Sequence, residues 1–525
     1  MIYIDTETSG LNPHVDTVTL FQYITPELDK AVLMPDPDFE QVHALLDQHE
    51  TIVGHNLPFD LGMLDYIPKQ NIEDTLYLSR VFFYEHDKHS LDVLATRVLG
   101  YDPYDALDKK AMQKTDWTQE LTQEQRDYAA LDVEILPEIL EYMKESIDSP
   151  SYQFDKVSIM DGLKLQRKGL PTLKPQANKQ IATYKLELSD LLDEIPFNPN
   201  SPKQTAAYLR CQSTSVKVLA RLEAKGNEMA GKVRKARQLG KKLNFLKKIT
   251  EKPRYKGTLA PATRSGRFSS KQNNLQNLPR EFKKFIGSKT NVIVSADFAQ
   301  LELRTIAHIT EDKTMTALFE QGKDLHGFSA ETLFGENYTK PQRQVAKVLN
   351  FSILYGAGAA TIADMLLTQT GIVLPEAKIQ QLKNKWLATF SGIKRWQNRG
   401  GSRHNNNKPW HTPKGRQYKS NRFTDHLSIE NQGAGAEVAR DALHYIVERS
   451  PYLINFVHDS YLGECKNDPA IYQPLCELIY DGMKQAWQNF SDIPMPVDVG
   501  VAHNWSDADA LENTLYIYGD SNAAT

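Results

Sequence analysis

The chain has 525 residues, of which 40% are apolar and 24% charged, with a formal net charge of −4 at pH 7. At about 150 residues per domain this length predicts two to four domains, and no run reaches the roughly 18 apolar residues of a membrane span. Cys211, Cys465 and Cys476 are too few and too scattered for a disulfide framework or a zinc cluster. A reducing, cytoplasmic compartment is therefore expected, and the start "MIYIDTETSG" has no export or transit pattern.

The positive charge is concentrated in one segment. Between Lys203 and Lys289 there are 23 Lys or Arg residues and four acidic residues. A surface that follows a nucleic-acid backbone has such a composition, whereas a short basic run is most often a solvated helix face. We therefore expect a polyanionic partner for this segment.

Residues 1–150 are predicted to form a mixed α/β unit that begins with the strand-like run "MIYIDTE". A second strand is expected near Leu20, and residues 122–146 have a helical pattern. The dipeptide Ser149-Pro150 is predicted to be a linker to the next unit.

Two acidic residues on the first strand are predicted to point the same way. Asp5 and Glu7 are separated by one residue, and alternate residues of a strand share a face. A divalent cation would relieve the repulsion between their carboxylates, although an exposed polar strand face has the same pattern. "GHNLPFD" adds Asp60, and "YAALD" places Tyr128 one helical turn before Asp132.

Together these segments resemble the DEDD superfamily of 3′–5′ exonucleases, in its tyrosine subclass. Asp5 and Glu7 match the first motif, Asp60 the second, and Tyr128 with Asp132 the third. The resemblance implies that the four carboxylates hold two metal ions and that Tyr128 positions the attacking water. Two ions about 4 Å apart would activate that water and stabilise the leaving oxygen of a phosphodiester.

Residues 190–255 are predicted to be helical and basic, followed by the loop "RSGRFSSKQNNLQNLP" and the strand-like run "NVIVSADFA". Asp297 ends this apolar run, where a buried carboxylate needs a compensating partner. Residues 311–400 are predicted to be successive helices interrupted by the loop "LYGAG". The segment "GSRHNNNKPWHTPKGRQYKS" is predicted to be a loop or hairpin.

The helix that contains "QRQVAKVLNFSILYG" has four regularly spaced residues. Arg343, Lys347, Phe351 and Tyr355 recur at every fourth position, so they share one helix face, cationic at one end and aromatic at the other. That face fits a ligand that is anionic at one end and flat at the other. An ordinary amphipathic helix has the same pattern.

The C-terminal part is predicted to contain a helix over 431–449, an apolar strand "YLINFVHDSYLGE", and a closing helix and strand near "MPVDVGVAHNW". Asp459, like Asp297, follows an apolar run. Two acids at adjoining strand ends would provide a second two-metal site. Taken separately, each could cap a strand end or lie in a surface turn.

These segments are similar to the three polymerase motifs of family A DNA polymerases: "DFAQLELR", the helix R-x3-K-x3-F-x3-Y-G, and "HDS". The resemblance covers about 198–505 and implies an α/β and α+β multidomain chain. An RNase H-like exonuclease domain over 1–150 would precede a right-hand polymerase domain over 151–525. Within it, the thumb is expected at about 190–255, the palm at about 256–310 and 420–525, and the fingers at about 311–419.

The resemblance also implies roles for single residues. Asp297 and Asp459 would hold two Mg²⁺ ions, for which Mn²⁺ can substitute, as would Asp5, Glu7, Asp60 and Asp132 in the exonuclease. The residues expected to bind the incoming dNTP are Arg343, Lys347, Phe351, Tyr355, His326, Glu302 and Gln300. Glu302, packed near Tyr355, would exclude a 2′-hydroxyl. The residues expected to contact DNA are Arg267, Gln432, Asn277 and His458.

The sequence departs from this family at two places. Ser460 stands where the third motif usually has Glu, and Ser428 stands four residues before Gln432, where relatives often carry Asn. The first change could alter metal occupancy or fidelity, and the second could alter mismatch sensing. Because exonuclease sequence starts at Met1, no 5′ nuclease domain is expected, and the length is closer to a phage replicase than to a cellular repair polymerase.

We therefore predict a DNA-directed DNA polymerase with 3′–5′ proofreading that acts in phage genome replication. Its expected partners are primer-template DNA, dNTPs and replisome proteins such as a helicase-primase or a single-strand-binding protein. A monomer in the cytoplasm, of the host if the chain is phage-encoded, is expected, with no membrane partner. The alternatives are a 3′ exonuclease whose polymerase part only binds DNA, and a nucleic-acid-binding scaffold with decayed sites.

Overall fold

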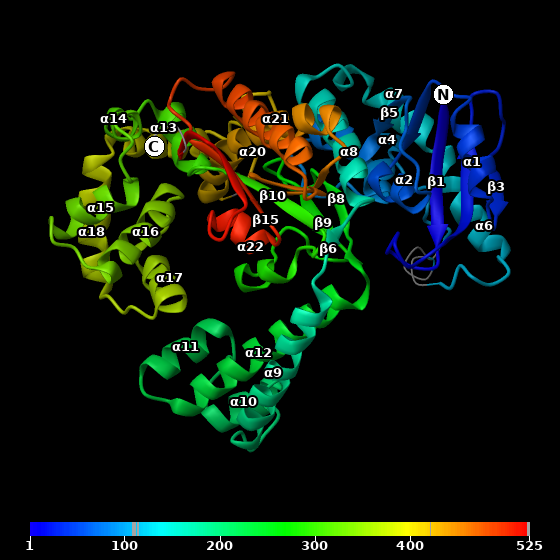
Figure 1. Ribbon diagram of the computed structural model, residues 1–525. Helices are drawn as coiled ribbons and strands as arrows, with labels where there is room; N and C mark the ends of the chain where they lie inside the picture. Colours follow the sequence, from blue (N-terminus) through cyan, green and yellow to red (C-terminus); the bar gives the residue numbers. More distant parts are fainter. Residues whose placement is uncertain (108–111, 113–114, 421, 522–525) are drawn as a thin grey trace.

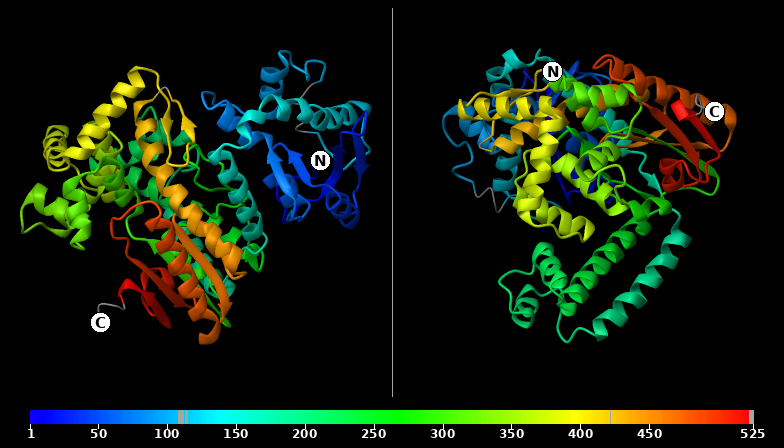
Figure 2. Two further views of the ribbon diagram at one scale, coloured as in Figure 1. Left: turned by 90° about the horizontal axis from the view of Figure 1, so that it is seen from above. Right: turned by 90° about the vertical axis from the view of Figure 1, so that its left-hand side faces the viewer.

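The computed structural model describes residues 1–107, 112, 115–420 and 422–521 (Figure 1). Two five-stranded sheets organise these residues, one in the N-terminal unit and one in the C-terminal unit. Figure 1 shows the N-terminal unit on the right, the second sheet in the centre, and two groups of helices that project to the left and downward. Viewed from above, the N-terminal unit stands beside the rest of the molecule (Figure 2).

The first sheet has the order β3-β2-β1-β4-β5. Its strands are β1 (Ile2–Thr8), β2 (Val18–Ile24), β3 (Val32–Pro35), β4 (Thr51–Gly54) and β5 (Asn71–Asp74). β1 is antiparallel to β2 and parallel to β4, so it lies at the centre of a mixed sheet. The surrounding helices are α1 (Phe39–Leu46), α2 (Leu57–Met63), α3 (Thr75–Phe82), α4 (Leu91–Leu99), α6 (Gln123–Glu134) and α7 (Leu136–Tyr142), with the 3₁₀ turn η1 (Lys144–Ser146).

The helical stretch predicted over 122–146 is divided into α6, α7 and η1. α6 begins with a reciprocal capping box between Thr122 and Gln125. It ends just before Pro137, which lies in the first turn of α7. A proline lacks the N–H that a continuous helix needs at this point and clashes with the preceding turn. The break therefore follows directly from the sequence.

The prediction of a linker at Ser149-Pro150 is wrong. Pro150 is the first residue of α8 (Pro150–Gln166), a position where its missing N–H costs nothing. Tyr152 and Leu163 of α8 belong to the apolar core of the N-terminal unit, whereas Leu165 belongs to the core of the C-terminal unit. α8 is thus a rigid connection between the two units.

The second sheet is antiparallel throughout and has the order β13-β14-β10-β15-β16. Its strands are β10 (Asn291–Phe298), β13 (Leu453–Val457), β14 (Ser460–Lys466), β15 (Val497–Ala502) and β16 (Tyr516–Gly519). Nearby helices are η2 (Arg280–Phe285), α20 (Phe423–Arg449), α21 (Pro469–Gln488) and α22 (Trp505–Ala510). α20 begins eight residues before the predicted start at 431, because Leu427 and Ile429 extend its buried face.

The single strand predicted over "YLINFVHDSYLGE" is wrong, because β13 and β14 form a hairpin there. His458 and Asp459 make the two-residue turn, and His458 has φ 58°. Two-residue hairpins need such left-handed backbone and usually carry Asn or Gly. The sequence "HDS" has no such signal, so the turn was not predicted.

The two projecting groups are helical. The first contains α14 (Lys313–Glu320), α15 (Leu325–Phe334), α16 (Lys340–Leu354), α17 (Ala359–Thr370) and α18 (Glu376–Thr389), between α13 (Leu301–Thr310) and α19 (Ser391–Asn405). The second contains α9 (Lys174–Asp193), α10 (Pro202–Leu209), α11 (Val216–Ala224) and α12 (Glu228–Glu251), with a small core of its own around Leu219, Val233 and Leu239. This basic bundle extends away from the sheet (Figure 2).

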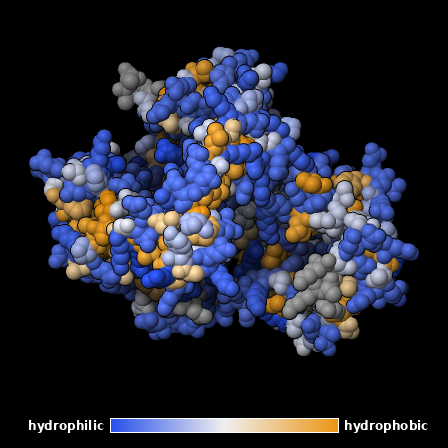
Figure 3. Space-filling model, turned by 90° about the horizontal axis from the view of Figure 1, so that it is seen from below, coloured by the Kyte–Doolittle hydropathy of each residue, from blue (hydrophilic) through white to orange (hydrophobic). Residues whose placement is uncertain are grey.

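Short strands complete the chain: β6 (Leu170–Pro171), β7 (Arg254–Tyr255), β8 (Thr258–Ala260), β9 (Ser269–Lys271), and the hairpin of β11 (Trp410–His411) and β12 (Gln417–Tyr418). Seen from below, the surface is mostly hydrophilic, with apolar residues in scattered patches (Figure 3). Among the described helices, none is long and apolar enough to cross a membrane.

Two candidate active sites

The first site lies where α6 crosses the central strand β1. The carboxylate oxygens of Asp5, Glu7 and Asp132 lie within 4.8 Å of one another. Asp5 and Glu7 share a face of β1, as their spacing predicts. Three oxygen donors at this separation can hold a divalent cation.

Asp60, from α2, lies beside these three carboxylates. Its Oδ1 accepts a hydrogen bond of 2.7 Å from the Thr6 hydroxyl, and the neighbouring Asp5 accepts one of 2.7 Å from Gln22 Nε2. The pKa values of Asp5 and Glu7 are raised well above the ordinary range. Burial is the larger cause, and repulsion from the other carboxylates is the second. Burial also raises the pKa of Asp60 to about 7. A bound cation would offset this crowding of negative charge.

Tyr128 stands one turn before Asp132 on α6. Its ring contacts the rings of Tyr104 and Trp117, with centroids 5.8 Å and 6.3 Å away. Burial and the Asp132 carboxylate raise the pKa of Tyr128, so its hydroxyl stays protonated and can donate. Tyr104, which donates a hydrogen bond to Asp132, was not predicted, because "YDPYD" matches no motif.

The second site lies at one end of the second sheet. Asp297 lies near the end of β10, opposite Ser460 of β14 and Asp498 of β15. The backbone N–H of the next residue, Phe298, donates to the Asp459 carbonyl at 3.4 Å, so the two aspartates come from adjoining backbones. Their carboxylates also repel each other, and a divalent cation between them would relieve this repulsion.

The electrostatics of this pair resemble those of the first site. The Asp297 side chain is open to solvent, but the protein around it still desolvates the carboxylate, and Asp459 repels it. Both effects raise the pKa of Asp297 well above its usual range. Burial raises the pKa of Asp459 to about 6, although the nearby Arg267 partly opposes the shift.

Gln276 holds the turn that carries Asp459. Its Nε2 donates to the Phe456 carbonyl at 2.6 Å, and its Oε1 accepts from the His458 backbone N–H at 3.3 Å. The side chain is 4% exposed. This residue was not singled out from the sequence, whereas its neighbour Asn277 was; Asn277 is exposed, and its backbone N–H donates to Asn274 Oδ1 at 2.9 Å.

The helix α16 presents the four spaced residues along one face. A capping box between Thr339 and Gln342 starts it. Arg343 and Lys347 are exposed, while Phe351 and Tyr355 are half-buried. Arg343 forms an ion pair of 2.6 Å with Asp324. A ligand that uses the Arg343 guanidinium must therefore compete with this partner.

His326 of α15 faces the same helix. Its Nδ1 lies 2.8 Å from Asn350 Nδ2, and its ring centroid lies 5.8 Å from that of Phe351. The orientation of the Asn350 amide is set by Trp386, whose Nε1–H donates to Oδ1 at 2.6 Å. Asn350 must then donate to Nδ1, which leaves the proton of a neutral His326 on Nε2. Burial lowers the pKa of His326 to about 4.

Glu302, at the start of α13, joins α16 to the second acidic site. Its carboxylate pairs with Arg267 and accepts a hydrogen bond from the Tyr355 hydroxyl. Asn431 of α20 donates to the Glu302 carbonyl at 3.0 Å and to the Tyr355 hydroxyl at 3.2 Å. Asn431 was not predicted, although "NQGAGAE" contains it.

The other residues predicted for this site are Gln432, Gln300 and His458. Gln432 also hydrogen-bonds to Tyr355. Gln300 precedes α13 with φ 55°, and its Oε1 is buried without a partner among the described residues. Within the same described part of the chain, Nδ1 of His458 is likewise buried and unpaired. Ser428 donates back to the Asp425 carbonyl of its own helix at 3.0 Å.

Residues 167–507 match the family model described as DNA polymerase family A. The chain belongs to this family. Residues 1–148 match the model described as 3′-5′ exonuclease. The predicted fold, an exonuclease domain followed by a family A polymerase domain, is confirmed, and the protein is a DNA polymerase with an associated 3′–5′ exonuclease.

Similar proteins agree with this assignment. A DNA polymerase I of Aquifex aeolicus is 27% identical over 96% of both chains. A DNA polymerase I of Rhizobium leguminosarum is 26% identical over 89% of this chain but only 52% of its own length. The solved POL domain of Pol1 from M. smegmatis, in complex with DNA primer-template and dNTP, has a TM-score of 0.78 at 17% identity and covers 97% of this chain and 96% of its own. This likeness shows the fold alone.

Proposed function

We propose that this family A polymerase extends a primer 3′ end with dNTPs at Asp297 and Asp459, and removes mispaired ends at Asp5, Glu7, Asp60 and Asp132. The observation that carries the proposal is the presence of two separate acidic centres in one chain, each built from carboxylates that repel one another. The proposed domain limits are 1–150 for the exonuclease and 151–525 for the polymerase.

The carboxylates of both acidic sites are suitable ligands for divalent ions such as Mg²⁺. Both centres offer carboxylate oxygens, which Mg²⁺ and Mn²⁺ prefer. When bound, such a pair of ions lowers the pKa of the attacking oxygen and neutralises the leaving group. The protein's own part is to hold the carboxylates in place, and in the exonuclease to orient water through the protonated Tyr128 hydroxyl.

The face of α16 supports the nucleotide-binding role. Arg343 and Lys347 would bind the triphosphate, with the Nε2–H of His326 as a further donor. Phe351 and Tyr355 would meet the sugar and base. Gln300 and Glu302 would complete the dNTP set, and Glu302, which accepts a hydrogen bond from Tyr355, would exclude a 2′-hydroxyl.

Four residues are proposed to contact the DNA. Arg267 and Gln432 would face the minor groove at the primer terminus, where the acceptors are nearly degenerate, so that pairing geometry rather than sequence is tested. Asn277 follows Gln276 in the chain and the His458 N–H donates to the Gln276 side chain, and both Asn277 and His458 would contact DNA. The basic bundle of α9–α12 would follow the duplex backbone.

The test is extension of a labelled primer on a DNA template with Mg²⁺, with and without the four dNTPs. We expect lengthening with dNTPs, shortening without them, and neither after chelation by EDTA. Asp5→Ala should abolish shortening and leave lengthening intact, and Asp297→Ala should do the reverse. Shortening under both conditions would favour the alternative, an exonuclease whose polymerase part only binds DNA.

The cellular setting is a separate proposal. The length, composition and motifs of the sequence are the basis for four proposals: a replicative role in a phage, a monomeric state, a cytoplasmic location and replisome partners. The similar polymerases of Aquifex aeolicus and Rhizobium leguminosarum are bacterial, and the first of them matches over 96% of both chains. A compact length therefore does not distinguish a phage replicase from a cellular polymerase. A measurement of processivity with purified replisome proteins would distinguish them.

A further inference from the structure

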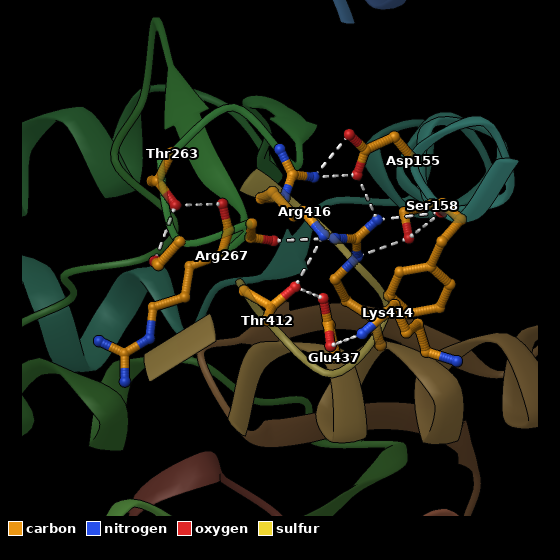
Figure 4. A network of polar contacts seen from close by, with 12 residues as sticks. Asp155, Ser158, Thr263, Arg267, Thr412, Lys414, Arg416 and Glu437 are labelled. Atoms are coloured by element: carbon orange, nitrogen blue, oxygen red, sulfur yellow. Dashed lines mark hydrogen bonds and ion pairs between the residues drawn. The ribbon is translucent and has the colours of Figure 1, made fainter. Parts of the chain in front are cut away.

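Arg267 projects from a tight turn formed by residues 263–267. The Thr263 hydroxyl donates to the Arg267 carbonyl at 2.9 Å (Figure 4). The Gly266 N–H donates to the Thr263 carbonyl at 3.0 Å. Gly266 has φ +76°, a conformation that favours glycine. The turn is the loop of the β8–β9 hairpin, whose last strand pair is Ala260 with Ser269. This two-stranded sheet holds the base of the turn, so the position of its tip also depends on what packs against it.

A buried arginine from α20 fixes this turn to α8. Arg440 is 1% exposed, and its Nη1 donates to the Gly266 carbonyl at 3.3 Å. The same guanidinium donates to Ser158 Oγ at 2.7 Å and to Asp155 Oδ1 at 2.7 Å, both on α8. One planar group thus spans from α8 to the residue that precedes Arg267. A lysine could not make these contacts together, because it lacks the fork of donors.

Asp155 is shared with a second arginine. Its carboxylate, with 0% exposure, also pairs with Arg416, whose Nη2 lies 2.5 Å from Oδ2 (Figure 4). Arg416 ends the turn of residues 412–416, which joins β11 to β12. This turn is held on α20, because the Thr412 hydroxyl and the Lys414 N–H both donate to Glu437 (Figure 4). Two cations therefore share one buried carboxylate, and a change at Asp155 would remove the direct partner of both and leave only the more distant charge of Glu437 to offset them.

The space around Gly266 shows how closely these groups meet. A Cβ added to Gly266 would lie 2.9 Å from Arg440 Nη1 and 3.5 Å from Arg416 Nε. The first turn of α8 is anchored in the exonuclease unit, where the Tyr152 hydroxyl accepts from the Asp74 N–H at 2.7 Å and donates to Glu73 at 2.8 Å. The turn is therefore held against a helix that is itself fixed in both units.

We propose that Arg440 and Asp155 are positioning residues for Arg267. They hold the 263–267 turn against α8, so that the Arg267 guanidinium reaches Glu302 and the primer terminus. This inference rests on the role proposed above for Arg267 at the primer end. Neither residue touches substrate; each acts through the position of the turn.

A double-mutant cycle between Arg440→Lys and Arg267→Ala tests the coupling. The quantities to measure are kcat and KM for extension of matched and mismatched primer ends, together with degradation of single-stranded DNA. Arg440→Lys should lower kcat/KM on matched ends by about tenfold, about 1.4 kcal/mol, and leave single-strand degradation unchanged. The double variant should behave like Arg267→Ala alone, since the two changes remove one function.

Independent effects that multiply in the double variant would overturn the inference. If Arg267→Ala alone leaves extension of matched and mismatched ends unchanged, the proposed role of Arg267 fails, and the inference fails with it. Should Arg440→Lys not fold, Gly266→Ala provides the second variant, because its Cβ would clash with the Arg440 guanidinium and disturb its contact with the turn without removing the arginine. It should show the same lack of additivity with Arg267→Ala.

A matched control lies next to the same helix. Arg167, at the C-terminal end of α8, makes a two-pronged contact with Asp65, from Nε to Oδ1 at 2.6 Å and from Nη2 to the carbonyl at 2.8 Å. In the described part of the chain, no hydrogen bond joins Arg167 to the 263–267 turn. Arg167→Lys should therefore retain wild-type extension kinetics. A loss equal to that of Arg440→Lys would mean that any weakening of α8 has this effect, which would contradict the specific role.

Discussion

The hydroxyl of Tyr355 donates a hydrogen bond to the carboxylate of Glu302, and the same carboxylate pairs with Arg267. Tyr355 follows the last turn of α16, Glu302 lies in the first turn of α13, and Arg267 projects from the turn of residues 263–267. One carboxylate thus links the proposed nucleotide face to the proposed primer-binding residue. Its two contacts can be separated by substitution.

Glu302→Ala and Glu302→Gln are expected to differ in sugar selectivity. Alanine opens space beside Tyr355, so the preference for dNTP over rNTP should fall by about 10- to 200-fold, the range that one pocket contact supplies. Glutamine keeps the volume and should retain most of the selectivity while weakening the pairing with Arg267. Single-nucleotide incorporation of dNTP and rNTP measures the ratio. Equal loss of selectivity in both variants would mean that charge, not space, excludes the 2′-hydroxyl.

Gln276→Leu is expected to impair synthesis without affecting degradation. The change leaves the Phe456 carbonyl and the His458 N–H without their partner, each a buried group that costs about 1–3 kcal/mol when unpaired. The turn that carries Asp459 should then shift, and a shift of about 1 Å can lower kcat by about 100-fold. Steady-state extension and single-strand degradation give the two rates. A parallel fall in both would indicate general destabilisation instead.

The parts of the sites that follow local rules could be predicted from the sequence. Strand alternation placed Asp5 and Glu7 on one face, and the four-residue step placed Arg343 and Tyr355 along one helix. The resemblance to known motifs added Asp60, which no local pattern connects to Asp5.

Contacts between polar residues that are far apart in the sequence could not be predicted. Asp155 and Arg416 are 261 positions apart, and no periodicity or composition connects them. Gln276 and Asn431 lie inside recognised motifs, but their roles depend on backbone groups that only the folded chain brings close. The turn at His458 escaped prediction because its left-handed backbone is carried by a histidine, whereas the usual hairpin signal is Asn or Asp followed by Gly.

The stability of the protein is expected to fall in acid through His326. Its pKa is lowered to about 4 in the folded protein, against about 6.5 in the unfolded chain. Between these values the unfolded chain binds a proton that the folded chain does not, so the free energy of unfolding falls as the pH drops from 6.5 to 4. The loss is about 2 kcal/mol at about pH 5 and is small at about pH 7.

Urea denaturation of wild type and His326→Gln at about pH 7 and about pH 5 tests this. The variant lacks the titrating group, so its free energy of unfolding should fall less between the two pH values. His14, whose pKa is also lowered to about 4, is present in both proteins and cancels in the comparison. An identical decrease in both proteins would show that His326 does not resist protonation.

Ser460 provides a test of the altered third motif. It is 8% exposed, and its hydroxyl has no hydrogen-bond partner in the described part of the chain. Ser460→Ala should therefore leave the free energy of unfolding within about 1 kcal/mol of wild type and leave the extension rate unchanged. A large loss of extension would mean that the hydroxyl contacts a reacting group.

Ser460→Glu is expected to behave differently. Ser460 pairs with Asp297 across the sheet, so a glutamate there would add negative charge beside a carboxylate whose pKa is already raised. The melting temperature should fall without divalent ions, because like charges repel in a desolvated site. Added Mg²⁺ should restore more stability to this variant than to Ser460→Ala, since an ion that binds only the folded state stabilises it more the more tightly it binds. An Mg²⁺-induced rise in melting temperature that is equal in the two variants would show that position 460 does not take part in holding the metal.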